Sequence, residues 1–118
     1  MQTLNLSGNS ISDISALGGL TNLTELDWSY NKNISISALA NLTNLQTLHL
    51  SGNNISDISA LANLTNLQTL TLINNNISDV SPLLNLSGLR LLNLSKNNLT
   101  EQQVGELRQK FPQAQICY

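Results

Sequence analysis

Charged residues, aromatic residues and cysteine are all scarce in this chain of 118 residues. Charged residues make up 10 %, against about 25 % in an average soluble protein. The net charge is −2 and the five basic residues form no run, so the composition argues against a nucleic-acid-binding surface. Aromatic residues at 3 % mean that the core must be aliphatic. Cys117 is the only cysteine, which excludes an internal disulfide.

Signals for export or membrane insertion are also missing from the sequence. A strand-like pattern follows Met1 directly, where a signal peptide would have a basic segment and an apolar run. No apolar run approaches the ~18 residues of a membrane span. We expect a chain that is cytoplasmic as it stands, or a piece of a secreted or cell-surface protein.

A regular repeat dominates the chain. Leucine recurs at positions 4, 26, 48, 70 and 92, and asparagine at positions 9, 31, 53, 75 and 97. The pattern LxxLxLxxNxI, seen from Leu45 to Ile55, is typical of a leucine-rich repeat. One such unit cannot bury its apolar side alone, so the units must stack into a solenoid. The sequence predicts a single domain over residues 1–118, with repeats at 1–22, 23–44, 45–66, 67–88 and 89–110.

Each repeat divides into a strand, a turn and a helical segment. Polar and apolar residues alternate over 47–51, which predicts a half-buried strand with Leu48 and Leu50 inward. Apolar residues spaced by three then follow Asp57, which favours a short 3-10 helix or a run of turns with Asp57 as its cap. Where the strand turns away, a stacked asparagine amide can bond the backbone groups that would otherwise lack partners. This predicted ladder consists of Asn9, Asn31, Asn53, Asn75 and Asn97.

The stretch ISDISALANLTNLQTL, residues 55–70, resembles the internalin-type leucine-rich repeats of bacterial surface proteins. The resemblance covers essentially the whole chain, with a weaker fit in the last repeat. It implies an α/β fold: a right-handed solenoid with a parallel sheet on its concave face and short helical turns on its convex face. It also implies that the concave face binds a protein. The N-terminal helical cap and the wall anchor of that family have no counterpart in the sequence.

The second repeat departs most from the common pattern. Trp28 stands at an inward strand position that is leucine elsewhere, and Tyr30 replaces a glycine of the neighbouring repeats. Asn33 takes the place of an isoleucine, so we expect a changed backbone path over residues 32–34. Two interpretations remain open. The repeat has drifted with Trp28 as core filler, or Tyr30 and the altered turn form a recognition patch.

The two ends of the chain differ. No polar cap precedes the first repeat, so its strand edge and aliphatic side would face water. Either a cap is lost or supplied elsewhere, or this uncapped edge mediates self-association. At the other end, Thr100 and Gln103 form a capping-box pattern, and the helix that follows ends at Pro112. A C-terminal cap over residues 100–118 is predicted, with a sixth strand at 113–117 in which Ala114 and Ile116 continue the spacing of the repeat.

Candidate functional residues lie on the expected concave face. Stacking places Asp27 beside His49, with Glu25 on the same face. A catalytic metal site needs about three well-placed protein ligands, which a flat sheet does not offer, so a solvated cross-strand pair is favoured over a metal or acid–base site. Cys117 lies three strands from His49, about 15 Å away and too far for the imidazole to activate the thiol.

From these features we expect a non-catalytic module, without metal or cofactor, that binds a protein partner through the concave face. An interface of ordinary size buries about 800 Å² per partner, whereas this face offers on the order of 300 Å². Either the binding is weak, or the chain is part of a longer array, or the rims take part. The alternative is a structural or self-associating unit, or a fragment of a larger secreted bacterial surface protein. The predicted protein-binding residues are Glu25, Asp27, Tyr30, His49 and Ile73.

Overall fold

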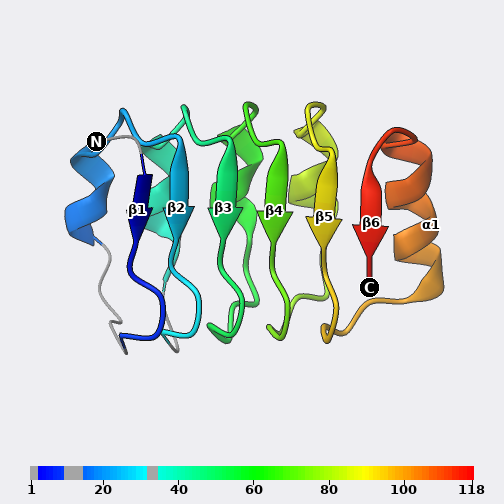
Figure 1. Cartoon of the computed structure of the whole chain (residues 1–118). Helices are drawn as coiled ribbons and strands as arrows, with labels where there is room; N and C mark the ends of the chain where they lie inside the picture. The colour runs from blue at the N-terminus through cyan, green and yellow to red at the C-terminus, as the bar shows by residue number, and fades with distance from the viewer. Residues whose placement is uncertain (1–2, 10–14, 32–34) are drawn as a thin grey trace.

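A parallel sheet of short strands forms one side of the molecule in the computed structural model of the chain, which describes residues 3–9, 15–31 and 35–118 except for the side chain of Ala16 (Figure 1). Within the described residues the sheet has six strands, and their order in space is their order in sequence. The strands are β1 (Thr3–Asn5), β2 (Glu25–Asp27), β3 (Thr47–His49), β4 (Thr69–Thr71), β5 (Leu91–Asn93) and β6 (Gln115–Cys117).

The first five strands stack in step with the sequence repeat. Leu26 pairs with Leu48, and Leu48 pairs with Leu70, so each repeat of the sequence completes one coil. Backbone N–H groups of one coil donate to carbonyls of the next, as from Leu50 N to Thr71 O at 2.9 Å. Alternate residues of a strand point to opposite faces, so these leucines face the interior while their neighbours face outward.

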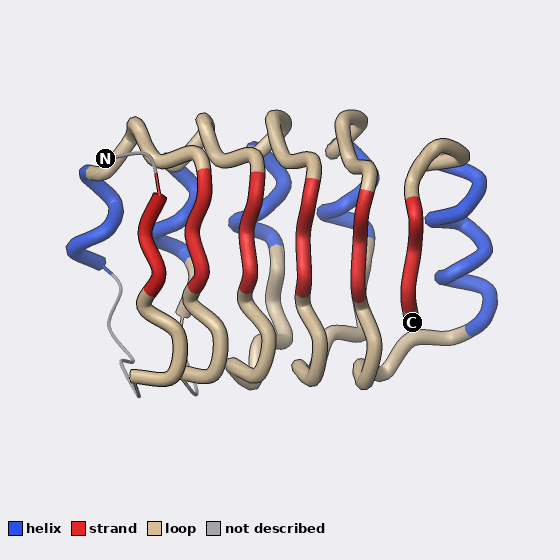
Figure 2. The backbone as a smooth tube through the Cα atoms, in the orientation of Figure 1, coloured by secondary structure: helices blue, strands red, loops and turns tan. Residues whose placement is uncertain are grey.

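Short helices cover the other side of the sheet (Figure 2). They are the 3-10 helices η1 (Ser15–Gly19), η2 (Ser37–Asn41), η3 (Ser59–Asn63) and η4 (Ser81–Asn85) and the α-helix α1 (Glu101–Lys110). The leucines spaced by three close successive tight turns, because Leu61 N donates to Ile58 O and Leu64 N donates to Leu61 O, both at 3.0 Å. The predicted solenoid, with a parallel sheet on one side and 3-10 turns on the other, is confirmed.

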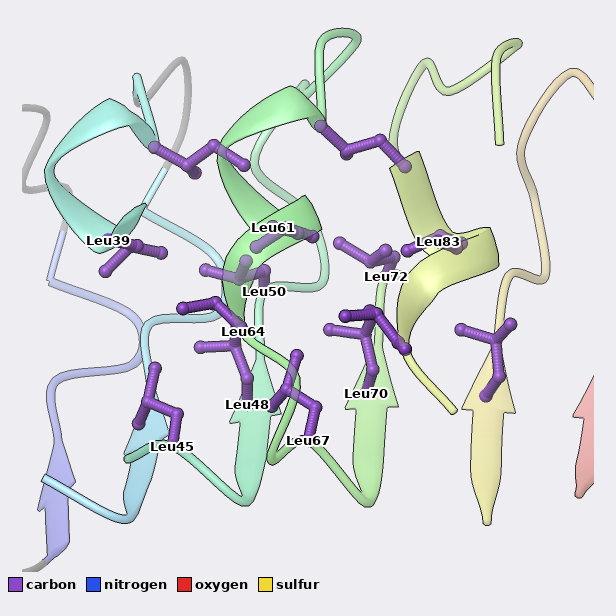
Figure 3. Close-up of a cluster of buried hydrophobic side chains, with 14 of the residues drawn as sticks. Leu39, Leu45, Leu48, Leu50, Leu61, Leu64, Leu67, Leu70, Leu72 and Leu83 are labelled. Atoms are coloured by element: carbon purple, nitrogen blue, oxygen red, sulfur yellow. The ribbon is translucent and has the colours of Figure 1, made fainter. Parts of the chain in front are cut away.

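The core lies between the sheet and the helical turns and is almost entirely aliphatic. Figure 3 shows leucines from the strands pointing toward leucines from the helical segments of the same and neighbouring coils. Leu48, Leu61 and Leu70 are completely buried. Each fully buried leucine contributes about 1.5–3 kcal/mol of transfer free energy, and it does so only because a coil is stacked on either side.

The last coil replaces the 3-10 turn by helix α1. The Thr100 side chain accepts from Gln103 N at 3.2 Å while the Gln103 side chain accepts from Thr100 N at 2.9 Å, so the predicted capping box is present. The Gln103 amide also donates to the Ser78 carbonyl at 2.5 Å, which ties the helix to the preceding coil. Val104 and Leu107 are buried against the core, and Phe111 closes the end of the helix.

The predicted register of the sixth strand is wrong by two residues. Leu92 pairs with Ile116 rather than with Ala114, so the last coil is longer than the others by this amount. The strand accordingly begins at Gln115 instead of residue 113. The ten residues of α1 follow a longer path than the five of a 3-10 segment, which accounts for the extra chain. Because the shift is an even number, Ile116 still faces the core and packs against it.

The outer edge of β1 is less well covered than the rest of the core. Leu4 and Leu6 are only partly buried, whereas their counterparts Leu48 and Leu50 are completely buried. Leu20, at the end of the first helical turn, is 44 % exposed. This edge therefore presents apolar side chains to solvent, as the sequence predicts for the first repeat.

Candidate interaction surface

The outward side of the sheet, together with the outward residue two positions after each of the first five strands (Ser7, Ser29, Ser51, Ile73 and Ser95), is called the open face below. The pairing register arranges its side chains in two principal columns. One column reads Thr3, Glu25, Thr47, Thr69, Leu91 and Gln115, and the other reads Asn5, Asp27, His49, Thr71, Asn93 and Cys117. Short polar side chains make up most of both columns, so the few charged, aromatic and aliphatic ones stand out chemically.

Asp27 and His49 lie opposite each other on β2 and β3, as the sequence predicts, but each has a different hydrogen-bond partner. The Asp27 carboxylate accepts from the backbone N–H of Ser29 at 3.0 Å. Nδ1 of His49 lies 2.8 Å from Oγ1 of Thr71 on the other side. Glu25 is exposed two residues before Asp27. The imidazole is therefore oriented by β4 and not by the carboxylate of β2.

Glu25, Asp27 and His49 could hold a metal ion only if three such side chains came close together. Among the residues that the structure describes, no three His, Cys, Asp or Glu side chains come close enough to hold one ion. Cys117 shares a column with His49 after the register shift, three strand steps away, or about 14 Å. The side chains of the open face and its rim can form ion pairs, hydrogen bonds and aromatic contacts with another molecule.

Tyr30 is an exposed aromatic residue at the rim of the open face, 56 % accessible to solvent. Its φ of 59° lies in the left-handed region, where glycine is preferred. Gly52, the equivalent residue one coil on, has φ 70°, and its missing side chain makes room for the Tyr30 ring. A Cβ at Gly52 would collide with Cδ1 of Tyr30. The ring is thus held against Gly52 while more than half of the side chain faces solvent.

Two small residues lie between the Asp27–His49 pair and the Tyr30 ring. Ser29 and Ser51 are both buried, although they point outward from the sheet. Oγ of Ser51 accepts from the backbone N–H of Ile73 at 3.2 Å, and Ile73 itself is partly buried. These two serines therefore lie among four of the predicted binding residues: Asp27, Tyr30, His49 and Ile73.

The asparagines after each strand join the coils to one another. Nδ2 of Asn53 donates to the carbonyls of Trp28 and Leu50 at 2.7 and 3.0 Å, and its Oδ1 accepts from Asn31 N at 2.8 Å. Because Asn53 is completely buried, these bonds satisfy backbone groups that water cannot reach. Donation to a carbonyl of the same coil recurs at Asn9, Asn31, Asn75 and Asn97.

A second asparagine ladder, on the ascending side of the coil, was not foreseen from the sequence. Nδ2 of Asn44 donates to Thr21 O at 2.9 Å, and Nδ2 of Asn66 donates to Thr43 O at 2.8 Å. The signal was available, because NLTN recurs at the same place in successive repeats. Gly88 interrupts this series, and a hollow of about 350 Å³ lies beside it.

Asp57 and Asp79, the carboxylates before η3 and η4, bond to the backbone. Ser59 N donates to Asp57 at 2.9 Å and Ser81 N donates to Asp79 at 3.0 Å, and these bonds hold both pKa values below the ordinary value of 3.8. The predicted cap role of Asp57 is wrong in position, because Ile58 occupies the N-cap of η3. Asp57 bonds to the first helical residue from one position further out.

Trp28 fills the core of repeat two, where it is 2 % exposed. Its indole N–H has no hydrogen-bond partner among the described residues. The predicted change of backbone path over residues 32–34 lies outside the described residues.

None of the helices in the described part of the chain combines the length and the apolar character that a membrane span needs.

Comparison with known proteins identifies the same repeat along the chain. The family described as "Leucine Rich repeats (2 copies)" matches residues 1–41, 29–63 and 43–85, and the family "Leucine Rich Repeat" matches residues 88–109. A comparison with curated proteins finds no match.

Several solved structures are similar over nearly the whole chain. Internalin C2 from Listeria monocytogenes shares 38 % identity over 98 % of this chain, with a TM-score of 0.90. Internalin F from the same species shares 34 % identity over 99 %, with a TM-score of 0.70. This chain spans 50 % and 40 % of those two chains.

A more distant likeness links the chain to a receptor with a bound partner. The ectodomain of the plant membrane receptor kinase GASSHO1/SCHENGEN3 from Arabidopsis thaliana, solved in complex with CASPARIAN STRIP INTEGRITY FACTOR 2, has 26 % identity and a TM-score of 0.75. The match covers 98 % of this chain and 15 % of the receptor chain. The resemblance to internalin-type repeats is confirmed by the two internalin structures. Since the family matches extend over most of its length, the chain belongs to the leucine-rich repeat family.

Proposed function

We propose that this chain is a non-catalytic module that presents the open face of its sheet to a protein partner. The observation that supports the proposal is the difference between the inward and the outward positions of each coil. Inward positions repeat as buried leucine and the turns repeat as asparagine, whereas outward positions vary from Glu25 to His49 to Ile73. Chemical variety is concentrated on a surface that contributes little to the core. The plant receptor of the same fold, which binds another protein, supports this assignment by analogy.

The size of the open face limits how the partner binds. Five steps of about 4.8 Å and strands of about 13 Å give a flat area on the order of 300 Å², well below the ~800 Å² per partner of a standard interface. The partner therefore also contacts the rim, where Tyr30 is exposed, or binds weakly. An exposed aromatic residue is the kind of anchor that contributes most to binding energy.

Site-specific photo-crosslinking tests the assignment of the binding face. A photo-reactive amino acid at Thr47, on the open face, should capture a discrete protein from a lysate of the source organism or its host. The same amino acid at Asn63, on the helical side of the same repeat, should not. Capture of the same protein at both positions, or at Asn63 alone, would contradict the proposal.

Alanine variants refine that experiment. Asp27→Ala and Tyr30→Ala should reduce capture at Thr47 with only a small loss of melting temperature. Neither side chain belongs to the buried core, and Asp27 gives up a single bond from Ser29 N. Glu101→Ala, on the exposed side of α1, is the matched control and should capture as the parent does. Undiminished capture by both open-face variants would show that the binding residues lie elsewhere.

Self-association is a second candidate function, favoured by the outer edge of β1. Leu20 of the same coil is 44 % exposed, and among the described residues no strand pairs with the outer edge of β1. Sedimentation over a range of concentrations tests it, with Leu20→Lys as the variant that should weaken any dimer. A single monomeric species at every concentration would remove this function.

A further inference from the structure

The charges of the open face are separated along the sheet. Glu25 and Asp27 place two carboxylates on β2. The outward residues of β3 and β4 are threonine, serine, isoleucine and one histidine, so the centre of the face carries no fixed charge. Arg90 and Lys96, both exposed, flank β5 in the chain. Three strand steps, about 14 Å, therefore separate an acidic end from a basic end.

The acidic end also has an aromatic surface. The Tyr30 side chain follows β2 at the rim, with one side of its ring against Gly52 and more than half of its area exposed. Asp27 is held in place by its bond to Ser29 N. Ser29 and Ser51 lie beside them and are buried, so a ligand would contact the carboxylate and the ring rather than the serine hydroxyls. A cation placed here would meet carboxylates on one side and a π face on the other.

We propose that the partner lays an arginine side chain across the β2 carboxylates and the Tyr30 ring, and directs an acidic side chain toward Lys96. Lys96 occupies the Tyr30 position three coils on, whereas Arg90 lies at the opposite end of β5. This inference rests on the proposed function, since it names the chemistry of the partner at the same face. Arginine fits better than lysine because its planar guanidinium stacks on an aromatic ring and pairs with a carboxylate through two hydrogen bonds. The partner segment thus has a basic and an acidic side chain about 14 Å apart.

A second copy of the chain is the competing occupant. Two copies related by a two-fold axis parallel to the strands would place each β2 opposite the other's β5, acid against base. The open face, however, offers on the order of 300 Å², while a stable dimer needs about 800 Å² from each copy. The area therefore favours a different protein that extends beyond the sheet onto the rims.

An NMR titration of the whole chain, labelled with nitrogen-15, tests the inference with a defined probe. The probe is the peptide acetyl-Arg-Ser-Gly-Ser-Glu-amide, whose charged residues are about 14 Å apart when extended. The largest amide shifts should occur at Ser29, Tyr30 and Gly52. Replacing the arginine by citrulline, which keeps the shape and removes the charge, should weaken binding about fivefold.

Matched charge variants separate specific from general attraction. The double variant E25Q/D27N should weaken the peptide about fivefold, while E101Q/E106Q, which removes the same charge from α1, should leave it unchanged. Equal binding of the citrulline peptide, or equal loss in both double variants, would overturn the inference. Dimerisation of the free chain that E25Q/D27N weakens would also overturn it, by making a second copy the occupant. If crosslinking at Thr47 succeeds while these tests fail, the binding face stands and only the partner's chemistry is wrong.

Discussion

Repeats two and three, residues 23–44 and 45–66, can be compared position by position because their strands pair in register. Leu26 and Leu48 are both completely buried at the centre of their strands. Asn31 and Asn53 are both buried, and each accepts a backbone N–H from the coil before it, at 2.9 and 2.8 Å. Inside the molecule, the two repeats use the same residues at these positions, and Trp28 in place of Leu50 is the exception.

On the open face and its rim the same two repeats differ at most positions, although their helical sides are identical over residues 36–45 and 58–67. Asp27 corresponds to His49, and Tyr30 corresponds to Gly52. An inward side chain contacts the coil before and the coil after, so any change is felt by both neighbours. An outward side chain faces solvent and is free to change. The difference teaches that the residues that stabilise the coil are separate from those to which we assign partner binding, and the following experiments test that separation.

The largest effect is expected from breaking what the two repeats share. Asn31→Ala and Asn53→Ala should each lower the free energy of unfolding by about 2–5 kcal/mol, because several buried backbone groups lose their partners at once. Chemical denaturation measures the loss. Asn9→Ala is the control, since Asn9 is exposed at the end of the ladder and should cost less than about 1 kcal/mol. Equal costs at all three positions would mean that burial does not set the energy of the ladder.

An intermediate effect on stability is expected at Tyr30 and Gly52, where the two repeats differ in sequence and are in contact. Gly52→Ala should cost about 1–3 kcal/mol, because the new Cβ would collide with the Tyr30 ring and the backbone has φ 70°. In a Tyr30→Gly background the collision disappears and only the backbone cost of about 1 kcal/mol remains. The double-mutant cycle measured by denaturation should therefore show coupling.

Gly19→Ala is the matched control for that cycle. A Cβ there meets nothing within 4 Å, so little change in stability is expected. If Gly52→Ala costs the same with and without the tyrosine ring, the ring moves aside freely and is not held at the rim as described above.

The smallest effect is expected from the carboxylates before the 3-10 helices. Bonds from Ser59 and Ser81 lower the pKa of Asp57 and Asp79 in the folded state, so both carboxylates stabilise the fold above the unfolded value near 3.8. That stabilisation is lost as the pH falls through the lowered folded values. Repeat two has Ser35 at this position and contributes nothing to the effect.

Melting curves recorded between neutral and strongly acidic pH check this prediction. The variant D57N/D79N should lose less melting temperature on acidification than the parent. Identical acid sensitivity of the two proteins would show that these bonds do not favour the folded state.

The period of the sequence carries most of the fold, because the same inward contacts recur in every coil. The period does not predict the path of the last coil. The apolar pattern of the sequence is compatible with either a ten-residue α-helix or a five-residue 3-10 segment. The two differ in length, and that length determines whether Ala114 or Ile116 pairs with Leu92. The constant spacing fails where a different kind of helix begins.

The contacts of the open face are harder to read from the sequence than the core. Spacing places His49 between Asp27 and Thr71 at equal distance, and nothing in the repeat decides which of them it bonds. The structure gives the bond to Thr71. Tyr30 and Gly52 illustrate the same limit, because their contact depends on a ring orientation that no sequence period specifies.

The longer final coil has a consequence for how such a chain can change in length. Between β2 and β5, removing or duplicating one whole repeat restores the pairing on both sides of the junction. Unequal recombination could therefore lengthen or shorten the middle of the array without disturbing its ends. The coil that contains α1 and leads to β6 is two residues longer than an internal repeat, so a duplication that includes it would not reproduce the spacing of the internal units.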